Sequence, residues 1–172
     1  MSTSELTVVC RTAAETEDLG ALLADGLGSA HGAPAVLYLT GELGSGKTTF
    51  ARGFLARLGV DAPVKSPTYT LLEIYPAGAL TVLHLDLYRL KSPSELEELG
   101  LREWAQPRHL WLIEWPERGA ARLPTADLTA KFAVGAGGHA VALAANSPLG
   151  EGWLAKLPLA QPATVEKDRP TP

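Results

Sequence analysis

Residues 41–49 read Gly41-Glu42-Leu43-Gly44-Ser45-Gly46-Lys47-Thr48-Thr49, a complete Gly-x-x-x-x-Gly-Lys-Thr phosphate loop. The glycines of such a loop let backbone N–H groups close around phosphate oxygens. We expect the ammonium group of Lys47 to reach the β- and γ-phosphates and the hydroxyl of Thr48 to bind Mg²⁺. The loop therefore predicts a nucleoside triphosphate and Mg²⁺ as ligands, held by all nine of its residues.

The segments beside the loop match the context that this motif requires. Residues 35–40 are a short, mostly apolar run, which is typical of a buried strand. Phe50, Phe54 and Leu58 recur at helical spacing before Gly59, where a helix can stop. Since strand, loop and helix follow in this order, a phosphate loop is a better interpretation than an ordinary glycine-rich turn.

Composition places the chain among ordinary globular proteins. Its 172 residues, 46% hydrophobic and 20% charged, predict one domain. The net charge of −4 argues against direct binding to nucleic acid. The single cysteine, Cys10, excludes an internal disulfide and is expected to be buried at a strand end. Without a signal segment or an apolar run near the roughly 18 residues of a membrane span, we expect a soluble cytoplasmic protein with no membrane partner.

The rest of the pattern predicts alternating strands and helices. Strands are expected at residues 5–10, 35–40, 68–75, 80–85, 109–113, 128–134 and 140–145. Helices are expected at residues 13–27, with Thr12 and Glu15 as a capping box, at 49–58, and from an N-cap at Ser92 to about Gly100.

The predicted fold is therefore a single α/β domain of the phosphate-loop NTPase kind. Its sheet is mixed, with helices on both faces and a C-terminal β-hairpin around residues 135–138. We expect this ATPase domain to span residues 1–149, and the Pro-rich residues 150–172 to form a disordered tail.

Two acidic residues stand at the ends of predicted strands. Glu114 follows the apolar run 110–113, and Asp86 follows strand 80–85. Ligands of open α/β sheets bind at the carboxyl edge of the strands, so both carboxylates can serve Mg²⁺ or the attacking water. The alternatives are a solvated Glu114 and an Asp86 that forms a turn or pairs with Arg89.

Other side chains have two interpretations each. Thr68, within the hydroxyl-rich segment 66–70, can belong to a switch loop that senses the γ-phosphate, or to a Pro turn that enters a strand. Arg89 can stabilise phosphate charge or form a structural ion pair. Trp115 can shield the site or contact a partner, whereas His84, between Leu83 and Leu85, is interpreted as a packed strand residue.

Taken together, four segments resemble the TsaE (YjeE) family. They are the phosphate loop, Ser66-Pro67-Thr68-Tyr69-Thr70, His84-Leu85-Asp86-Leu87-Tyr88-Arg89-Leu90 and Ile113-Glu114-Trp115-Pro116-Glu117-Arg118. The helix segment Glu95-Leu96-Glu97-Glu98-Leu99-Gly100 is similar as well, so that the resemblance covers about residues 5–145.

This resemblance implies a weak bacterial ATPase, with ATP and Mg²⁺ as cofactors, that is required for threonylcarbamoyladenosine modification of tRNA. It implies binding to the TsaB and TsaD proteins, which ATP hydrolysis resets between rounds, and contact with tRNA only through that complex. By motif, Lys47, Thr68, Asp86 and Glu114 would serve hydrolysis, and the metal would lie on Thr48, Asp86 and Glu114. Glu117 and Thr16 would contact nucleotide, and His139 stands where relatives often carry arginine.

Three other function classes fit less well. A small-molecule or nucleoside kinase shares the phosphate loop but usually adds an Arg-rich lid, and the sequence contains no such insertion. A non-catalytic nucleotide-binding protein would not need the acidic pair of Asp86 and Glu114. A GTPase usually carries an Asn-Lys-x-Asp segment to read guanine, and this chain has none.

Overall fold

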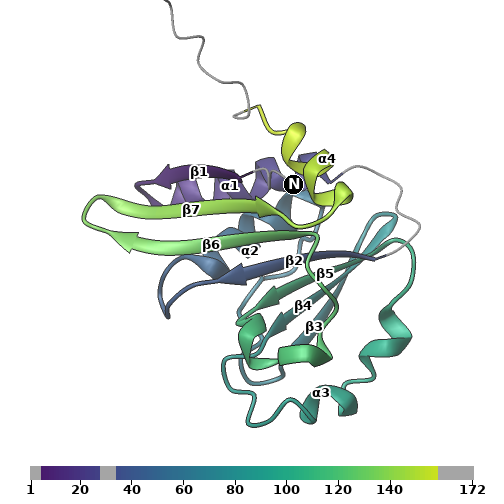
Figure 1. The fold of residues 1–172 in the computed structure, drawn as a ribbon. Coiled ribbons are helices and arrows are strands. Elements are labelled where there is room, and N and C mark those ends of the chain that lie inside the picture. The colour runs from purple at the N-terminus through teal and green to yellow at the C-terminus, as the bar shows by residue number, and fades with distance from the viewer. Residues whose placement is uncertain (1–4, 28–33, 159–172) are drawn as a thin grey trace, which may run out of the picture.

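A seven-stranded mixed sheet forms the centre of the protein, and the computed structural model describes residues 5–27 and 34–158 (Figure 1). Across the sheet, the strands follow the order β1 (Glu5–Cys10), β7 (Gly138–Ala145), β6 (Leu128–Gly135), β2 (Ala35–Thr40), β5 (His109–Glu114), β4 (Leu80–Asp86) and β3 (Leu72–Ala77). The four strands β6, β2, β5 and β4 are parallel neighbours, whereas β1 and β7 on one side and β3 on the other pair antiparallel.

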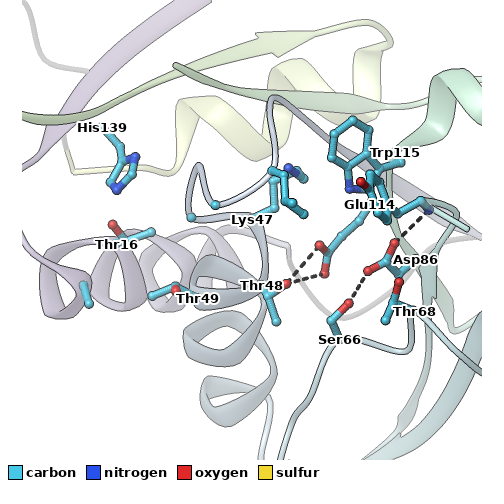
Figure 2. A pocket seen from close by; sticks show the side chains of 15 residues that line it. Thr16, Lys47, Thr48, Thr49, Ser66, Thr68, Asp86, Glu114, Trp115 and His139 are labelled. Carbon is cyan, nitrogen blue, oxygen red and sulfur yellow. Dashed lines mark hydrogen bonds between the residues drawn. The ribbon is translucent and has the colours of Figure 1, made fainter. Parts of the chain in front are cut away.

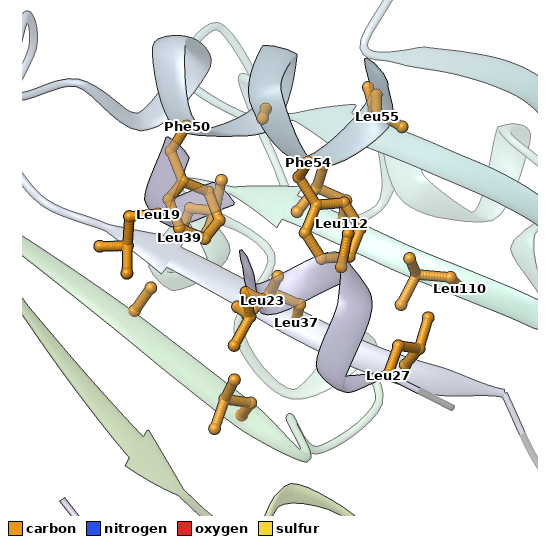
Figure 3. Packing of buried hydrophobic residues seen from close by; sticks show 14 of the residues in the cluster. Leu19, Leu23, Leu27, Leu37, Leu39, Phe50, Phe54, Leu55, Leu110 and Leu112 are labelled. Atoms are coloured by element: carbon orange, nitrogen blue, oxygen red, sulfur yellow. The ribbon is translucent and has the colours of Figure 1, made fainter. Parts of the chain in front are cut away.

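Helices α1 (Ala13–Gly26), α2 (Lys47–Arg57) and α4 (Pro148–Ala155) cover one face of this sheet. Their apolar side chains pack on alternate residues of the central strands, which share a face because strand side chains alternate. Figure 3 shows part of this larger core, formed by Leu19, Leu23, Leu27, Leu37, Leu39, Phe50, Phe54, Leu55, Leu110 and Leu112.

Shorter elements cover the opposite face. They are α3 (Glu95–Glu98) and the 3₁₀ turns η1 (Leu101–Trp104), η2 (Pro116–Arg118) and η3 (Ala120–Arg122). A second apolar cluster, which includes Leu83, Leu85, Trp111 and Ile113 of the strands, lies beneath them. The predicted α/β fold with a mixed sheet, helices on both faces and a C-terminal hairpin is confirmed.

Two predicted elements are shorter than expected. The strand predicted from residue 68 begins at Leu72, because a turn closed by Leu71 N–H and the Pro67 carbonyl (2.6 Å) occupies the residues before it. The helix predicted from Ser92 contains only the single α-helical turn α3, because the backbone bonds on either side of it, from Glu95 N–H to Ser92 and from Gly100 N–H to Glu97, span three residues and form tighter turns. The Glu95 carboxylate accepts from the N–H groups of Lys91 and Ser92, 2.8 Å each. Since the strand begins only at Leu72, residues 66–70 form a loop outside the sheet.

The expected boundary between domain and tail at residues 149 and 150 is wrong. Residues 148–155 form α4, capped by the Ser147 hydroxyl, which accepts from Gly150 N–H at 3.2 Å. Trp153 is buried against α1 and donates from its indole to the carbonyl of Leu23 at 2.6 Å. The packed domain thus includes α4 and the buried Leu157, and residues 159–172 of the expected tail lie outside the described residues.

Within the described residues, no helix is long and apolar enough to cross a membrane. Cys10 is buried at the end of β1, as expected.

Candidate functional site

The carboxyl ends of β2, β4 and β5 meet at one edge of the sheet, and the candidate site lies there. The phosphate loop leaves β2 and enters α2, which begins at Lys47. Gly46, directly before the helix, has φ of 103°, a left-handed conformation that side chains disfavour. The loop thereby directs the positive N-terminal end of an eleven-residue helix into the site.

The ammonium group of Lys47 is held by the loop itself. Its Nζ donates to the carbonyls of Gly41 and Glu42 at 2.7 Å each, and to Ser45 Oγ at 3.3 Å. Burial lowers the pKa of Lys47, while the nearby charges of Glu114, Asp86 and Glu117 oppose that shift. The loop thus holds the ammonium group of Lys47 against its own carbonyls, beside the cleft that Lys47 lines.

Glu114 lies opposite the loop and is bonded to it. The Thr48 hydroxyl donates toward both carboxylate oxygens, 3.1 Å from Oε2 and 3.3 Å from Oε1 (Figure 2). Glu114 ends β5 and is only 2% exposed. This hydrogen bond brings together Thr48 and Glu114, two residues that the sequence predicted as ligands of Mg²⁺.

Asp86 stands next to Glu114, since the parallel register of β4 and β5 sets them opposite each other. Its Oδ1 accepts from Tyr88 N–H at 2.9 Å, and its Oδ2 accepts from the Ser66 hydroxyl. The loop at residues 66–70 is thereby attached to a carboxylate of the site. Glu114 is not the solvated residue of the alternative interpretation. Asp86 is bonded to Ser66 in place of Arg89, and its bond with Tyr88 N–H also supports the turn after β4, so its turn-forming interpretation holds beside its place in the site.

A cleft of about 400 Å³ runs along this edge. At one end are Lys47, Thr48, Asp86, Glu114 and Trp115, and at the other end Thr16 and His139 face each other (Figure 2). Ser66 and Thr68 of the loop at 66–70 lie beside Asp86 (Figure 2), and the phosphate loop and the start of α2 add Leu43, Gly44, Gly46 and Thr49 to the lining. The structure therefore brings most of the predicted site residues together.

Four predicted residues lie elsewhere. Gly41, Glu42 and Ser45 do not line the cleft, and they hold Lys47 instead. Glu117, expected to contact nucleotide, is exposed on η2 and reaches the site only through its charge on Lys47.

Arg89 packs on an aromatic ring, and within the described residues it does not form the structural ion pair that was one of its two interpretations. Its guanidinium lies 4.5 Å from the ring centre of Tyr69, which is 82% exposed. It also lies outside the residues that line the cleft. A role in stabilising phosphate charge is therefore unsupported by its position.

The sequence left the place of Trp115 open. Its ring centre lies 4.3 Å from Lys47 Nζ and 5.0 Å from the ring of Tyr88, and Trp115 lines the cleft. Trp115 has φ of 58°, which is unusual for a bulky residue and common near functional sites. Of the two interpretations, shielding of the site agrees with this position.

The donor set fits a magnesium ion held together with phosphates. A hydroxyl and two carboxylates converge here, and oxygen donors are the ligands that Mg²⁺ prefers. Among the described residues, no group of three acidic, His or Cys side chains could hold a metal without further ligands. Mg²⁺ usually retains water and binds through one or two carboxylates plus phosphate, so this sparse set is sufficient.

Comparison with known proteins identifies the family. The model of the family described as "Threonylcarbamoyl adenosine biosynthesis protein TsaE" matches residues 10–139. The chain belongs to the TsaE family. The match includes the phosphate loop, Asp86, Glu114 and His139, and thus every residue that lines the cleft.

Curated relatives agree with this assignment. The TsaE protein of Haemophilus influenzae is 48% identical over 93 residues, which are 54% of this chain and 59% of that protein. The TsaE protein of Treponema pallidum is 39% identical over 61% of this chain and 77% of its own length. The matched part thus spans about three-fifths of the Haemophilus relative.

A solved structure extends the similarity to the whole fold. Bacillus subtilis YdiB superposes with a TM-score of 0.74 at 26% identity, over 91% of this chain and 96% of that one. This coverage exceeds that of the family match, so the similarity of fold extends beyond residues 10–139.

Proposed function

We propose that this protein is the ATP-binding and ATP-hydrolysing subunit required for threonylcarbamoyladenosine modification of tRNA in the cytoplasm. It would act as a switch on the TsaB–TsaD pair and meet tRNA only through that complex. The observation that carries the hydrolytic part is the bond between Thr48 and Glu114 at the mouth of the phosphate loop. Membership of the TsaE family supports the pathway.

The groups of the site divide the work of phosphate transfer. Lys47 would leave the loop carbonyls and neutralise phosphate charge, while the N-terminal end of α2 binds the phosphates. Thr48, Glu114 and Asp86 would hold Mg²⁺, which offsets charge on the phosphates when bound. Glu114, which lines the cleft beside Thr48, would also be available to orient the attacking water.

The loop at residues 66–70 supports the switch. Ser66 bonds Asp86 and Thr68 lines the cleft, so the loop is in contact with both the acidic pair and the nucleotide space. Tyr69 is exposed on the same loop, where a partner could touch it. Binding or loss of the γ-phosphate would therefore change the conformation of the loop at residues 66–70, part of which is exposed on the protein surface.

Phosphate release from ATP tests this function. We expect slow release by the protein alone and a large increase on addition of TsaB and TsaD, with no added acceptor. Glu114→Gln should keep ATP binding and lower turnover by about 100-fold, the size typical for one group that stabilises a transition state. Glu151→Gln, on the exposed face of α4, is the matched control and should retain wild-type turnover.

Two results would contradict the proposal. Unchanged turnover in Glu114→Gln would remove this carboxylate from the mechanism. Phosphate transfer that occurs only when a small hydroxyl acceptor is supplied would indicate a kinase instead.

A further inference from the structure

His84 lies behind Glu114 and has no part in the function proposed above. It is fully buried on β4, and its Nε2 lies 2.8 Å from Oε1 of Glu114. It is not among the residues that line the cleft. Any effect of His84 on a bound nucleotide must therefore pass through Glu114.

The strand register produces this contact. His84 and Asp86 are two residues apart on β4, so both face the side of the sheet that carries α1 and α2. Asp86 lies opposite Glu114 on β5, and His84 lies opposite Leu112. His84 thus stands diagonally across from Glu114, at a distance that a ring side chain can span.

Glu114 is the polar partner of this ring. We assign the proton to Nε2, because its neighbour is a carboxylate that can only accept when ionised. The other ring nitrogen, Nδ1, is buried and has no hydrogen-bond partner within the described residues. An apolar side chain would fill this strand position without the cost of a buried unpaired nitrogen, so packing alone does not account for a histidine here.

We propose that His84 is a positioning residue that holds the Glu114 carboxylate in the orientation that serves the divalent cation. Oε1 accepts from His84 and Thr48, and Oε2 accepts from Thr48, so these contacts fix the plane of the carboxylate. The inference rests on the proposed nucleotide and cation site. Outer-shell partners of this kind typically contribute about 10- to 100-fold in metal affinity or activity.

Two amide variants test the role of the Nε2 donor. His84→Gln places an N–H group near the position of Nε2, whereas His84→Asn is too short to reach Glu114. The affinity of Mn²⁺ for the ADP complex is measured by electron paramagnetic resonance, and turnover is measured with TsaB and TsaD. We expect the Asn variant to lose about tenfold or more in Mn²⁺ affinity and in kcat, and the Gln variant to regain most of both.

Binding of ADP in the presence of EDTA provides the control, because the phosphate loop does not contact His84. Both variants should bind ADP within about twofold of wild type, since no residue of the phosphate loop is changed. Equal Mn²⁺ affinities in the two variants would overturn the proposal. Loss of ADP binding by both variants in EDTA would overturn it as well, because it would show that His84 is needed for the fold. A wild-type protein without turnover would refute the ATPase function, and the Mn²⁺ titration would still decide the role of His84.

Discussion

Cys10 ends β1 inside the core, with 1% of its surface exposed and its thiol 3.6 Å from the carbonyl of Glu15. Burial raises the pKa of this thiol, and the negative charge of Glu15 acts in the same direction, while a hydrogen bond with Thr16 opposes both. The folded protein therefore keeps the proton at a pH where the unfolded chain has lost it.

The stability that the neutral thiol contributes should be present below the ordinary pKa of cysteine and lost as pH rises above it. We predict that the difference in unfolding free energy between wild type and Cys10→Ala shrinks as pH rises above about 8.5, the ordinary pKa of a cysteine thiol. Urea titrations of both proteins at several pH values measure this difference. A difference that stays constant or grows with pH would refute the assignment of a protonated buried thiol.

At the scale of the element, α1 and α2 approach each other closely through two glycines. A methyl group on Gly53 would overlap the backbone of Glu17, and one on Gly20 would overlap the backbone of Phe50. Since the obstacle is backbone in both cases, it cannot move aside as a flexible side chain would. The approach sets the position of α2, and with it the direction in which the phosphate loop faces.

We predict that Gly53→Ala lowers the free energy of unfolding by about 1–3 kcal/mol or more, as expected for overpacking. Gly152→Ala is the matched control, because Gly152 is also helical but is exposed with open space around it. There the higher helix propensity of alanine should add up to about 1 kcal/mol. Equal effects of the two substitutions in denaturant titrations would show that α1 and α2 do not depend on this contact.

Local signals explain which elements could be predicted from the sequence. The phosphate loop and the helix after it carry a motif and an apolar period, and the hairpin at β6 and β7 carries a glycine turn. Helix α4 carries only a start signal, Ser147 followed by Pro148, and the two glycines within its eight residues lower its helix propensity. Its stability comes from the burial of Trp153 against α1, 130 residues away in sequence, which a local pattern cannot reveal.

The same limit applies to the site when the whole molecule is considered. Lys47, Thr48, Asp86 and Glu114 could be predicted because each stands in a motif or at a strand end. His84 and Ser66 gain their roles from contacts across strands and loops, at separations of 30 and 20 residues. Glu117 lies near the motif in sequence, yet η2 carries its side chain into solvent. The sequence positions of these residues were enough to predict the chemistry of the site. The hydrogen bonds of His84 and Ser66 with the acidic residues could be seen only in the tertiary structure.

Because the cleft is assembled from α1, the phosphate loop, β4, β5 and the hairpin, a ligand bound there should stabilise the whole fold. A ligand that binds only the folded state at 100 times its Kd adds about 2.7 kcal/mol to the unfolding free energy. For a domain of this size, we predict that Mg²⁺ and ADP raise Tm by about 5–10 °C. Scanning calorimetry measures this shift.

Lys47→Ala separates ligand binding from the fold. This substitution removes the cation that the loop carbonyls hold, so the variant should fold and show little shift of Tm with Mg²⁺ and ADP. AMP, which lacks the β-phosphate, should likewise give little shift with the wild-type protein. The phosphate loop supplies both the ammonium group and the backbone N–H donors for the phosphates. A Tm shift with Mg²⁺ and ADP in Lys47→Ala as large as that of wild type would therefore place nucleotide binding outside this cleft.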